Sequence, residues 1–328
     1  MMDTGTILVR CEGIKKLFPV NKGLFSGKQK FVHALDDVSL EIYAGETLGL
    51  VGESGCGKST LGRALIRLIE PTEGKIKFCG EDITHLPPKE LRALRQEMQI
   101  IFQDPYASLN PRMTIYEALE APLINFHCPA EERGRRIHEI AQKVGLNEQW
   151  LYRYPHEFSG GQRQRIVISR ALILKPKFVV CDEAVSALDV SVRSQVLNLM
   201  SELQKDMALT YLFISHDLSV IKHVSDRIIV MYLGRLVEIA SKRELLNNPL
   251  HPYTQALISA IPKPVIGEKT EATVLQGDIP SPIDPPPGCP FHPRCKYCMP
   301  CCTTEFPGPR DVGGGHFVSC HLIHKSKM

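Results

Sequence analysis

Residues 52–59 read GESGCGKS and match the pattern G-x-x-x-x-G-K-[ST] at every fixed position. Glycines at this spacing let the backbone wrap a chain of phosphates with its N–H groups pointing inward, and a helix that begins directly afterwards adds partial positive charge. Lys58 is then expected to reach the β- and γ-phosphates, and the hydroxyl of Ser59 to bind Mg²⁺. Because an apolar run precedes the segment and a helical pattern follows it, the sequence predicts a phosphate-binding loop.

Cys56 lies inside this loop and allows two interpretations. A helix N-terminus lowers the pKa of a thiol, so Cys56 could be sensitive to oxidation. The alternative is a tolerated small residue that contributes only its backbone N–H group to phosphate binding. The second interpretation is favoured.

Asp182 and Glu183 directly follow the apolar run Phe178–Cys181. A buried strand that ends in two carboxylates suits a Mg²⁺-nucleotide site, with Asp182 acting on the ligand shell of the metal and Glu183 polarising the attacking water as general base. Taken alone this pattern is weak, since apolar strands often end in acidic residues. Together with a complete phosphate-binding loop earlier in the chain, it predicts nucleotide hydrolysis.

Residues 158–162 read FSGGQ, which resembles the signature segment of ATP-binding cassette (ABC) ATPases. That signature is usually LSGGQ, and Phe158 stands here in place of leucine. The other marks of the family are present in order: Gln103 resembles its Q-loop glutamine, Ser186–Asp189 its D-loop, and His216 its switch histidine. The resemblance implies an α/β fold of the P-loop NTPase type, with a mixed sheet core and a helical subdomain.

The resemblance also implies an ATPase mechanism shared between two subunits. The phosphate loop of one subunit would hold ATP, and the signature segment of the other would close over the γ-phosphate, so that hydrolysis opens a head-to-tail dimer. Glu183 and His216 are implied as catalytic residues, with His216 contacting the γ-phosphate. Mg²⁺ is expected on Ser59, Gln103 and Asp182, and Gln103 would link the metal to the helical subdomain.

Further site residues are carried over from the family motifs. In the phosphate loop and Q-loop, the ATP-binding residues are Gly52, Glu53, Ser54, Gly55, Cys56, Gly57, Lys58, Ser59, Thr60 and Gln103. The signature residues, which would act on ATP bound to the partner subunit, are Ser159, Gly160, Gly161 and Gln162. The D-loop residues are Ser186 and Asp189. Adenine usually stacks on an aromatic residue before the second strand, and both Phe18 and Phe31 qualify. The stretch between them, Val20 to Lys30, looks like an insertion.

The elements that must position these residues are indicated by periodicity. Over residues 1–240, short apolar runs alternate with helical patterns, which is typical of α/β architecture. Strands are predicted at Val38–Ile42, Thr47–Val51, Phe178–Cys181 and Leu212–Ser215. Helices are predicted at Lys58–Ile69, Glu131–Leu146, Val190–Met207 and Tyr253–Ala260, with another that begins near Gln162.

The C-terminal part of the chain resembles one branch of the family. HPYTQAL at residues 251–257 and GCPFHPRC at residues 288–295 are similar to segments that follow the cassette in peptide and nickel importers. The expected domains are an ABC nucleotide-binding domain over 1–240, with a helical subdomain at about 104–165, a proline-rich extension over 241–288 and a Cys-rich module over 289–328. Twelve of the 24 prolines fall between Pro262 and Pro309, so neither regular helix nor strand is predicted there.

Six of the 11 cysteines lie in the last 40 residues. In a reducing compartment such a cluster favours metal over disulfides. The branch pattern places ligands at Cys289, Cys295, Cys302 and Cys320, and their irregular spacing favours a [4Fe–4S] cluster over the alternative, Zn²⁺. Other side chains could take part in the ligand set, namely Cys298, Cys301, His316 and His321. Free thiols that hold no metal are the remaining interpretation.

Composition sets outer limits on function. Hydrophobic residues make up 43% and charged residues 23%, the net charge is +3, and no strong basic field points to nucleic acid. The longest apolar runs are well short of about 18 residues, so no membrane span is expected. The N-terminus lacks the charged-then-apolar pattern of a secretory signal. These features lead us to expect a cytosolic location. The resemblance to importer ATPases further implies a peripheral position at the cytoplasmic face of the plasma membrane, through the permease subunits.

Partners and cargo follow from the branch resemblance alone. They are a second homologous ATPase subunit in a heterodimer, two membrane-spanning permease subunits and, indirectly, a substrate-binding protein. The implied function is ATP hydrolysis that powers the import of di- or oligopeptides. The alternatives are an importer ATPase for nickel or another cargo, and an ABC ATPase of DNA repair, translation or cluster assembly that transports nothing.

Overall fold

The structure is a computed structural model that describes residues 5–20, 29–261, 275 and 277–325. The chain forms two compact units that do not follow its linear order. Unit 1 comprises Met1–Leu8, Tyr43–Thr47 and His85–Ile214, and unit 2 comprises Val9–Ile42, Leu48–Thr84 and Ser215–Met328. The stretch from Val20 to Lys30, expected to be an insertion, lies mostly outside the described residues.

Unit 1 is built on three parallel strands. Strand β7 pairs with β6 on one side and with β8 on the other. The strands are β6 (Met98–Ile101), β7 (Phe178–Asp182) and β8 (Thr210–Ser215). Every residue of β7 and β8 is buried, which explains why both are continuous apolar runs rather than alternating ones.

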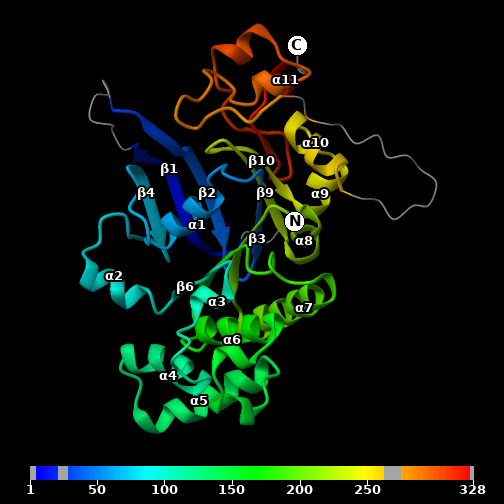
Figure 1. Cartoon of the computed structure of the whole chain (residues 1–328). Helices are drawn as coiled ribbons and strands as arrows, with labels where there is room; N and C mark the ends of the chain where they lie inside the picture. Colours follow the sequence, from blue (N-terminus) through cyan, green and yellow to red (C-terminus); the bar gives the residue numbers. More distant parts are fainter. Residues whose placement is uncertain (1–4, 21–28, 262–274, 276, 326–328) are drawn as a thin grey trace, which may run out of the picture. The chain divides into compact units, whose positions relative to one another are not determined.

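Helices make up most of the remainder of unit 1 (Figure 1). They are α2 (Pro88–Leu94), α3 (Pro105–Ser108), α4 (Ile115–Asn125), α5 (Ala130–Lys143), η1 (Glu148–Tyr152), η2 (Pro155–Glu157), α6 (Gly160–Leu172) and α7 (Val190–Met207). Helix α6 packs against α3, α4, α5 and α7, so it forms the centre of the helical layer. The start of α4 is fixed by a capping box between Thr114 and Glu117.

Unit 2 contains a four-stranded sheet in the order β2-β1-β4-β5. Its strands are β1 (Ile7–Pro19), β2 (Phe31–Tyr43), β4 (Glu73–Phe78) and β5 (Glu81–Asp82). The pairs β1–β4 and β4–β5 are antiparallel. The predicted strand Val38–Ile42 is therefore part of a longer element than its alternation indicates.

A mixed sheet forms the second layer of unit 2. Strand β3 pairs parallel to β9, β9 is antiparallel to β10, and β10 pairs with the short β12, which in turn pairs with β11. The strands are β3 (Thr47–Val51), β9 (Arg227–Tyr232), β10 (Arg235–Ser241), β11 (Arg310–Asp311) and β12 (Phe317–Val318). The C-terminal part thus contributes two strands to this sheet, both of them after Pro309 and hence beyond the proline-rich stretch.

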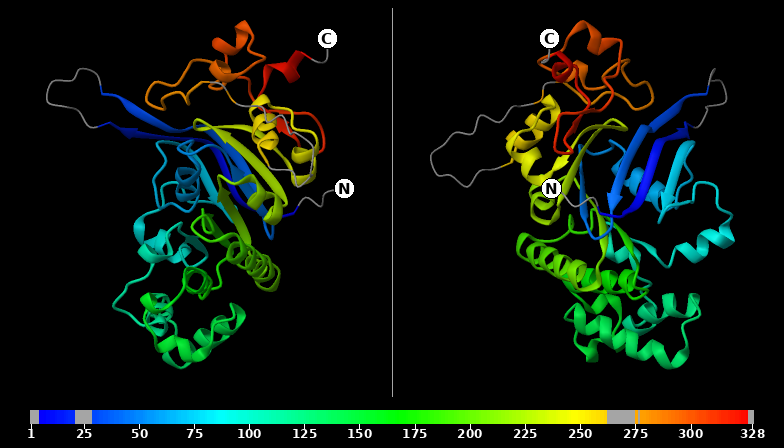
Figure 2. Two further views of the ribbon diagram at one scale, coloured as in Figure 1. Left: turned by 45° about the vertical axis from the view of Figure 1, so that its right-hand side comes forward. Right: turned by 180° about the vertical axis from the view of Figure 1, so that it is seen from behind.

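The helices of unit 2 are α1 (Lys58–Leu65), α8 (Leu218–Val224), α9 (Lys242–Asn247), α10 (Pro252–Ser259), η3 (His292–Arg294), η4 (Pro300–Thr303) and α11 (His321–Lys325). Helix α9 packs against β9 and β10. The Cys-rich segment (residues 289–328) lies near the turn that joins β9 to β10, as the two views of Figure 2 show. Within the described residues, no helix is both long enough and apolar enough to cross a bilayer.

The elements predicted from the sequence are largely confirmed. Strand β3 and helix α7 match their predicted ranges residue for residue. The predicted helix Lys58–Ile69 ends early, at Leu65, because Arg67 adopts a left-handed conformation with φ of 54°. Helix α10 begins at Pro252, one residue before its predicted start, since proline is well tolerated in the first turn.

Candidate nucleotide-binding site

The predicted phosphate loop connects β3 to α1 in unit 2. Two of its glycines are required by close backbone contacts. A Cβ atom on Gly52 would lie 2.2 Å from the carbonyl oxygen of Met231, and one on Gly57 would lie 2.2 Å from that of Ala34. Gly57 also has φ of 105° directly before α1 begins. No other residue type fits these two positions without moving the strands around them.

Lys58 lies at the centre of the loop and is only 5% exposed. Its Nζ atom donates hydrogen bonds to the carbonyl oxygens of Gly52 (2.8 Å) and Glu53 (2.9 Å). Phosphate oxygens entering the loop would offer this ammonium group charged acceptors in place of neutral ones, and such bonds are stronger. The lysine is thus already inside the loop that would receive the phosphates.

Cys56 is buried beneath the same loop, with 5% of its surface exposed. Burial raises the pKa of its thiol, although the neighbouring Lys58 acts in the opposite direction. A buried thiol with a raised pKa is a poor nucleophile. The structure therefore favours the interpretation of Cys56 as a small residue within the loop.

In unit 1, three of the predicted site residues form one hydrogen-bonded group. The side-chain amide of Gln103 donates to the carboxylate of Glu183 (3.0 Å) and to the hydroxyl of Ser186 (3.4 Å). The hydroxyl of Ser186 in turn donates to the backbone carbonyl of Glu183 (3.0 Å). The predicted Q-loop, general base and D-loop are therefore in direct contact, although 80 residues separate Gln103 from Glu183.

Glu183 has an unusual backbone conformation, with φ of 51°. Only a small share of residues other than glycine adopt the left-handed region, and they do so at a cost. The backbone N–H of Glu183 donates to the carbonyl of Ile214 at the end of β8 (3.1 Å), which helps to hold this turn. Asp182, one residue earlier, closes β7 and is 4% exposed, whereas Glu183 is half-buried. Adjacent carboxylates thus occupy different environments.

The predicted signature segment forms the start of α6. Ser159 is the N-cap: its hydroxyl accepts a bond from the N–H of Gln162, and the side chain of Gln162 accepts one from the N–H of Ser159 (2.9 Å). Phe158 is buried and makes an edge contact with Trp150, at 6.0 Å between ring centroids. Phenylalanine in place of leucine therefore serves as an anchor, and the exposed Ser159 is held at the open N-terminus of a 13-residue helix.

Gly161 allows α6 and α7 to approach closely. A Cβ atom at this position would lie 2.4 Å from Cγ1 of Val192 in α7, whereas a Cβ on Gly160 would make only an ordinary contact, 3.7 Å from Leu188. The two glycines of the signature thus have different structural requirements. Asp189, the last residue of the D-loop, directly precedes α7.

The remaining predicted residues are placed as follows. His216 is exposed in the turn between β8 and α8, where Asp217 caps α8 by accepting a bond from the N–H of Ser219 (2.8 Å). Phe18 and Phe31 lie on the neighbouring strands β1 and β2. Phe31 is 36% exposed, and Phe18 is half-buried, with Nζ of Lys16 5.0 Å from its ring centroid.

Sequence reasoning missed two residues that hold the phosphate loop from the C-terminal part of unit 2. The guanidinium of Arg294 donates to both carboxylate oxygens of Glu53, at 2.7 and 3.1 Å, and the hydroxyl of Tyr253 accepts a bond from the N–H of Glu53 (2.9 Å). Tyr253 belongs to the motif at residues 251–257 and Arg294 to the motif at residues 288–295. The two motifs marked these residues in the sequence, but they gave no indication of what the side chains contact.

A buried polar network joins β10 to the same C-terminal part. The carboxylate of Glu238 accepts bonds from the N–H groups of Leu250 (2.8 Å) and His251 (2.9 Å) and lies 2.7 Å from Nε2 of His316. Glu238, His251 and His316 are each 1% exposed. Nδ1 of His251 caps α10 by accepting from the N–H of Tyr253 (3.1 Å). Burial lowers the pKa of His251 to about 4, against a smaller opposing effect of Glu238.

The four cysteines predicted as metal ligands line one small cavity in unit 2. Gly288, with φ of 70°, allows the N–H of Cys289 to donate to the carbonyl of Cys302 (2.9 Å). Burial raises the pKa of the thiols, to about 12 for Cys289 and about 11 for Cys320. Such thiols ionise readily only next to a cation, so the chemistry of the cavity suits a metal centre.

A tighter grouping of possible ligands includes two residues that line this cavity, Cys302 and His321. Within the described part of the chain, the group of three whose ligand atoms all lie within 4.8 Å of one another is Cys301, Cys302 and His321. A tetrahedral zinc site with Zn–S bonds of about 2.3 Å needs sulfurs roughly 4 Å apart. The trio therefore fits one small ion.

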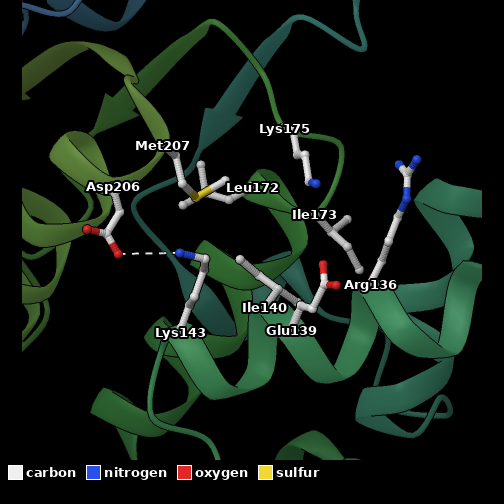
Figure 3. Close-up of a pocket in the computed structure, with 9 residues that line it drawn as sticks. All are labelled: Arg136, Glu139, Ile140, Lys143, Leu172, Ile173, Lys175, Asp206 and Met207. Carbon is white, nitrogen blue, oxygen red and sulfur yellow. Dashed lines mark hydrogen bonds and ion pairs between the residues drawn. The ribbon is translucent and has the colours of Figure 1, made fainter.

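Unit 1 also has a pocket that contains none of the predicted site residues (Figure 3). Side chains from α5, from the end of α6 and the segment after it, and from the end of α7 surround it. Lys143 forms an ion pair with Asp206 at one side of it (3.3 Å). The lining mixes charges of both signs with apolar groups: Arg136, Glu139, Ile140, Lys143, Leu172, Ile173, Lys175, Asp206 and Met207.

The fold and these motifs define an ATPase of the ABC transporter family, and comparisons with known proteins establish that the chain belongs to it. Residues 35–186 match the family described as ABC transporter. Residues 237–302 match the family described as oligopeptide/dipeptide transporter, C-terminal region. ATP is accordingly the substrate, and Mg²⁺ is its cofactor.

Among its relatives, the chain is 52% identical over 320 residues to the oligopeptide transport ATP-binding protein AppF of Bacillus subtilis (strain 168), covering 96% of this chain and 97% of that protein. It is 49% identical over 321 residues to the dipeptide transport ATP-binding protein DppF of Escherichia coli (strain K12), covering 98% and 96%.

Two solved structures resemble its fold. CbiO1 from Clostridium perfringens, part of the ABC transporter complex cbiONQ, has a TM-score of 0.65 at 26% identity, over 74% of this chain and 92% of that one. The ATP-binding cassette MJ0796, in a dimeric post-hydrolysis state bound to ADP and Pi, has a TM-score of 0.63 at 29% identity, over 72% and 99%.

Proposed function

We propose that this protein is the ATP-hydrolysing subunit of an ABC importer for di- and oligopeptides. The observation that carries the proposal is similarity over nearly the whole chain, C-terminal part included, to proteins named for oligopeptide and dipeptide transport. The intact phosphate loop and the carboxylate of Glu183 favour an active enzyme over a non-catalytic binding subunit.

We assign the steps of ATP hydrolysis to residues by their chemistry. Lys58 and the backbone N–H groups of the loop bind the phosphates. Glu183 orients and deprotonates the attacking water. Gln103 donates a hydrogen bond to the carboxylate of Glu183 and so fixes its direction. His216 contacts the γ-phosphate. Ser59, Gln103 and Asp182 would hold Mg²⁺, which neutralises charge on the phosphates when bound.

The adenine ring would stack on Phe18 or Phe31. Both lie on adjacent strands of one sheet, and Phe31 is the more exposed of the two. Exposure supports Phe31 as the stacking residue, because an aromatic ring that is still in contact with water gains most from a ligand that covers it.

The protein would act in a head-to-tail dimer in which Ser159, Gly160, Gly161 and Gln162 of one subunit close over ATP bound to the other. The N-terminus of α6, where these residues lie, is suited to a γ-phosphate. MJ0796, a structural neighbour, is dimeric with ADP and Pi bound. In our proposal the partner is a homologous but different ATPase subunit.

Two permease subunits would complete the transporter, and a separate binding protein would deliver the peptide. The ATPase would bind at the cytoplasmic face of the plasma membrane through its helical subdomain, about residues 104–165, because closing and opening of the ATPase dimer must reach the permeases. Functionally we divide the chain into the cassette (1–240), a family-specific extension (241–288) and a Cys-rich module (289–328).

We further propose that Cys289, Cys295, Cys302 and Cys320 hold a [4Fe–4S] cluster. They surround a shared cavity, and their thiols are costly to ionise without a cation. The cluster would supply the cohesion that a segment with few regular elements lacks. Zinc on Cys301, Cys302 and His321 is the alternative, supported by their mutual proximity.

Reconstitution of the full transporter tests the proposal. The protein, its ATPase partner and the permeases are placed in proteoliposomes with a labelled tripeptide, the binding protein and ATP. Peptide uptake that needs ATP and stops with Glu183→Gln is expected. Uptake of nickel but not peptide would move the function to the other cargo, and ATP hydrolysis unaffected by permeases would favour an ABC ATPase that transports nothing.

A further inference from the structure

Glu53 in the phosphate loop forms an ion pair with Arg294 of the Cys-rich segment (residues 289–328). The guanidinium of Arg294 donates two parallel hydrogen bonds to the carboxylate of Glu53. The side chain of Arg294 is only 6% exposed. The same guanidinium also donates to the hydroxyl of Tyr232 (3.3 Å). A buried, two-pronged pairing of this kind fixes geometry as well as charge.

The backbone of Glu53, like its side chain, is hydrogen-bonded to the C-terminal part of unit 2. Its N–H donates to the hydroxyl of Tyr253, a fully buried residue of α10. The ring of Tyr253 packs against those of Tyr232 (4.8 Å between centroids) and Phe291 (5.4 Å). Phe291 lies three residues before Arg294, so one rigid aromatic cluster supports both contacts to the loop.

The position of Glu53 makes these contacts important for ATP binding. Glu53 is the second residue of the loop that receives a chain of negatively charged phosphates, so a free carboxylate there would repel the ligand. Lys58 donates to the backbone carbonyl of Glu53, but the carboxylate itself is paired with Arg294. If Lys58 turns toward bound phosphates and gives up its bond to the carbonyl of Glu53, Arg294 still pairs with the Glu53 carboxylate and neutralises its charge.

We infer that Arg294 is a positioning residue of the ATP site: it keeps the Glu53 carboxylate away from the phosphates and, together with Tyr253, fixes the start of the phosphate loop. This inference rests on the proposed role of residues 52–60 in binding ATP. It makes the Cys-rich segment part of the nucleotide site rather than an independent appendage. Because coupling between sites is reciprocal, nucleotide binding also orders the segment around Arg294.

The test measures ATP affinity of the full-length protein by calorimetry, together with KM and kcat. Arg294→Ala is expected to weaken binding about 10- to 100-fold, because it leaves a carboxylate unpaired beside the phosphates. Arg294→Lys should lose less, since it keeps the charge but not the fork. Lys296→Ala, which removes an exposed positive charge two residues away, is the matched control and should stay within about twofold.

The double variant Glu53→Gln/Arg294→Ala separates this role from a merely structural one. Without the carboxylate, the loss caused by Arg294→Ala should be mostly recovered, with KM returning toward the wild-type value. A structural role would instead lower kcat through a smaller active fraction and leave KM unchanged. Wild-type affinity in Arg294→Ala, or a double variant as weak as the single one, would overturn the inference.

Two further measurements keep the inference distinct from the proposed function. If Lys58→Ala binds ATP as well as the wild type, the phosphate-loop assignment itself fails. The effect of nucleotide on the Cys-rich segment is measured with ADP, so that no hydrolysis takes place. ADP should slow proteolysis of the segment in the wild type and should slow it much less in Arg294→Ala. Equal protection of both proteins would refute the coupling.

Discussion

The side-chain amide of Gln103 lies 3.0 Å from the carboxylate of Glu183, to which it donates a hydrogen bond. Gln103 follows β6 and Glu183 follows β7, and the parallel pairing of these strands brings the two residues together at one end of the sheet. This hydrogen bond fixes the direction of the carboxylate that we propose as the general base. The contact also connects the helical layer after Gln103 to the residue proposed to activate water.

Glu183→Gln is expected to bind ATP normally and to hydrolyse it about 10²–10⁴-fold more slowly, because the change removes the base and keeps the shape of the side chain. Calorimetry and a phosphate-release assay measure the two effects separately. Glu157→Gln, which alters an exposed glutamate of the same unit, is the control. Near-normal turnover in Glu183→Gln would refute the assignment of the general base.

Lys58→Ala should instead lose ATP affinity. The phosphates would then face the loop without the buried ammonium group, and a charge-assisted hydrogen bond contributes roughly 1.5–3 kcal/mol. Binding of a fluorescent ATP analogue gives the dissociation constant, and Lys30→Ala, at an exposed site, serves as the comparison. An unchanged constant in Lys58→Ala would contradict the phosphate-loop interpretation.

The two signature glycines provide a matched pair for a stability measurement. Gly161→Ala should lower the free energy of unfolding by about 1–3 kcal/mol, because the new Cβ would lie 2.4 Å from Val192 and force α6 and α7 apart. Gly160→Ala has room and removes a flexible residue from the unfolded chain, so stability should stay equal or rise slightly. Denaturant titration of both variants decides, and equal losses would argue against close packing at Gly161.

The proposed metal centre can be examined by colour and metal content. Anaerobically purified protein should be brown, absorb broadly near ~400 nm and contain iron and sulfide in about equal amounts. Cys289→Ser and Cys320→Ser should abolish the colour, while Cys301→Ser retains it. Colourless protein with one zinc per chain that is lost in Cys301→Ser would move the site to the Cys301, Cys302 and His321 group.

The buried His251 should make stability depend on pH. Its pKa is about 4 in the folded state and about 6.5 in the unfolded chain, so between these values only the unfolded chain takes up the proton. Stability therefore falls as pH drops from about 6.5 to 4, by a total of about 3 kcal/mol. Above pH 6.5 the residue is neutral in both states and has no such effect.

His251→Asn isolates this contribution, since asparagine can still cap α10 but does not titrate. Glu238 and His316 form the surrounding buried network and are unchanged in the variant, so the difference between wild type and variant is the quantity of interest. Denaturant titrations at pH 7, 5.5 and 4.5 should show a flatter pH dependence for the variant. Parallel curves would mean that His251 can be protonated in the folded state.

Elements with a strong local pattern were predictable from the sequence. Strand β3 is an uninterrupted buried run, and α7 carries 18 residues of helical pattern, so both were recognised from one stretch of chain. Helix α4 was not, because Pro122 inside it masks the helical pattern. Strands β11 and β12 have two residues each, and so short a segment has no period to detect.

The predicted site divides in the same way. The types and order of Lys58, Gln103 and Glu183 follow from local motifs. The pairing of Glu53 with Arg294 does not, because 241 residues separate them and neither carries a pattern that refers to the other. The left-handed backbone of Glu183 was equally invisible, since it is imposed by the sheet around it and not by the residue type.

The antiparallel pairing of β12 with β10 affects how readily the protein aggregates. Phe317 and Val318 occupy hydrogen-bonding groups along β10 that would otherwise face solvent, and the N–H of Ser319 adds a bond to the carbonyl of Val237 (2.9 Å). Uncovered strands of this kind are templates on which other chains add and precipitate. Loss of order in the C-terminal part, by proteolysis or by removal of a metal, would uncover that strand and make the protein prone to aggregation.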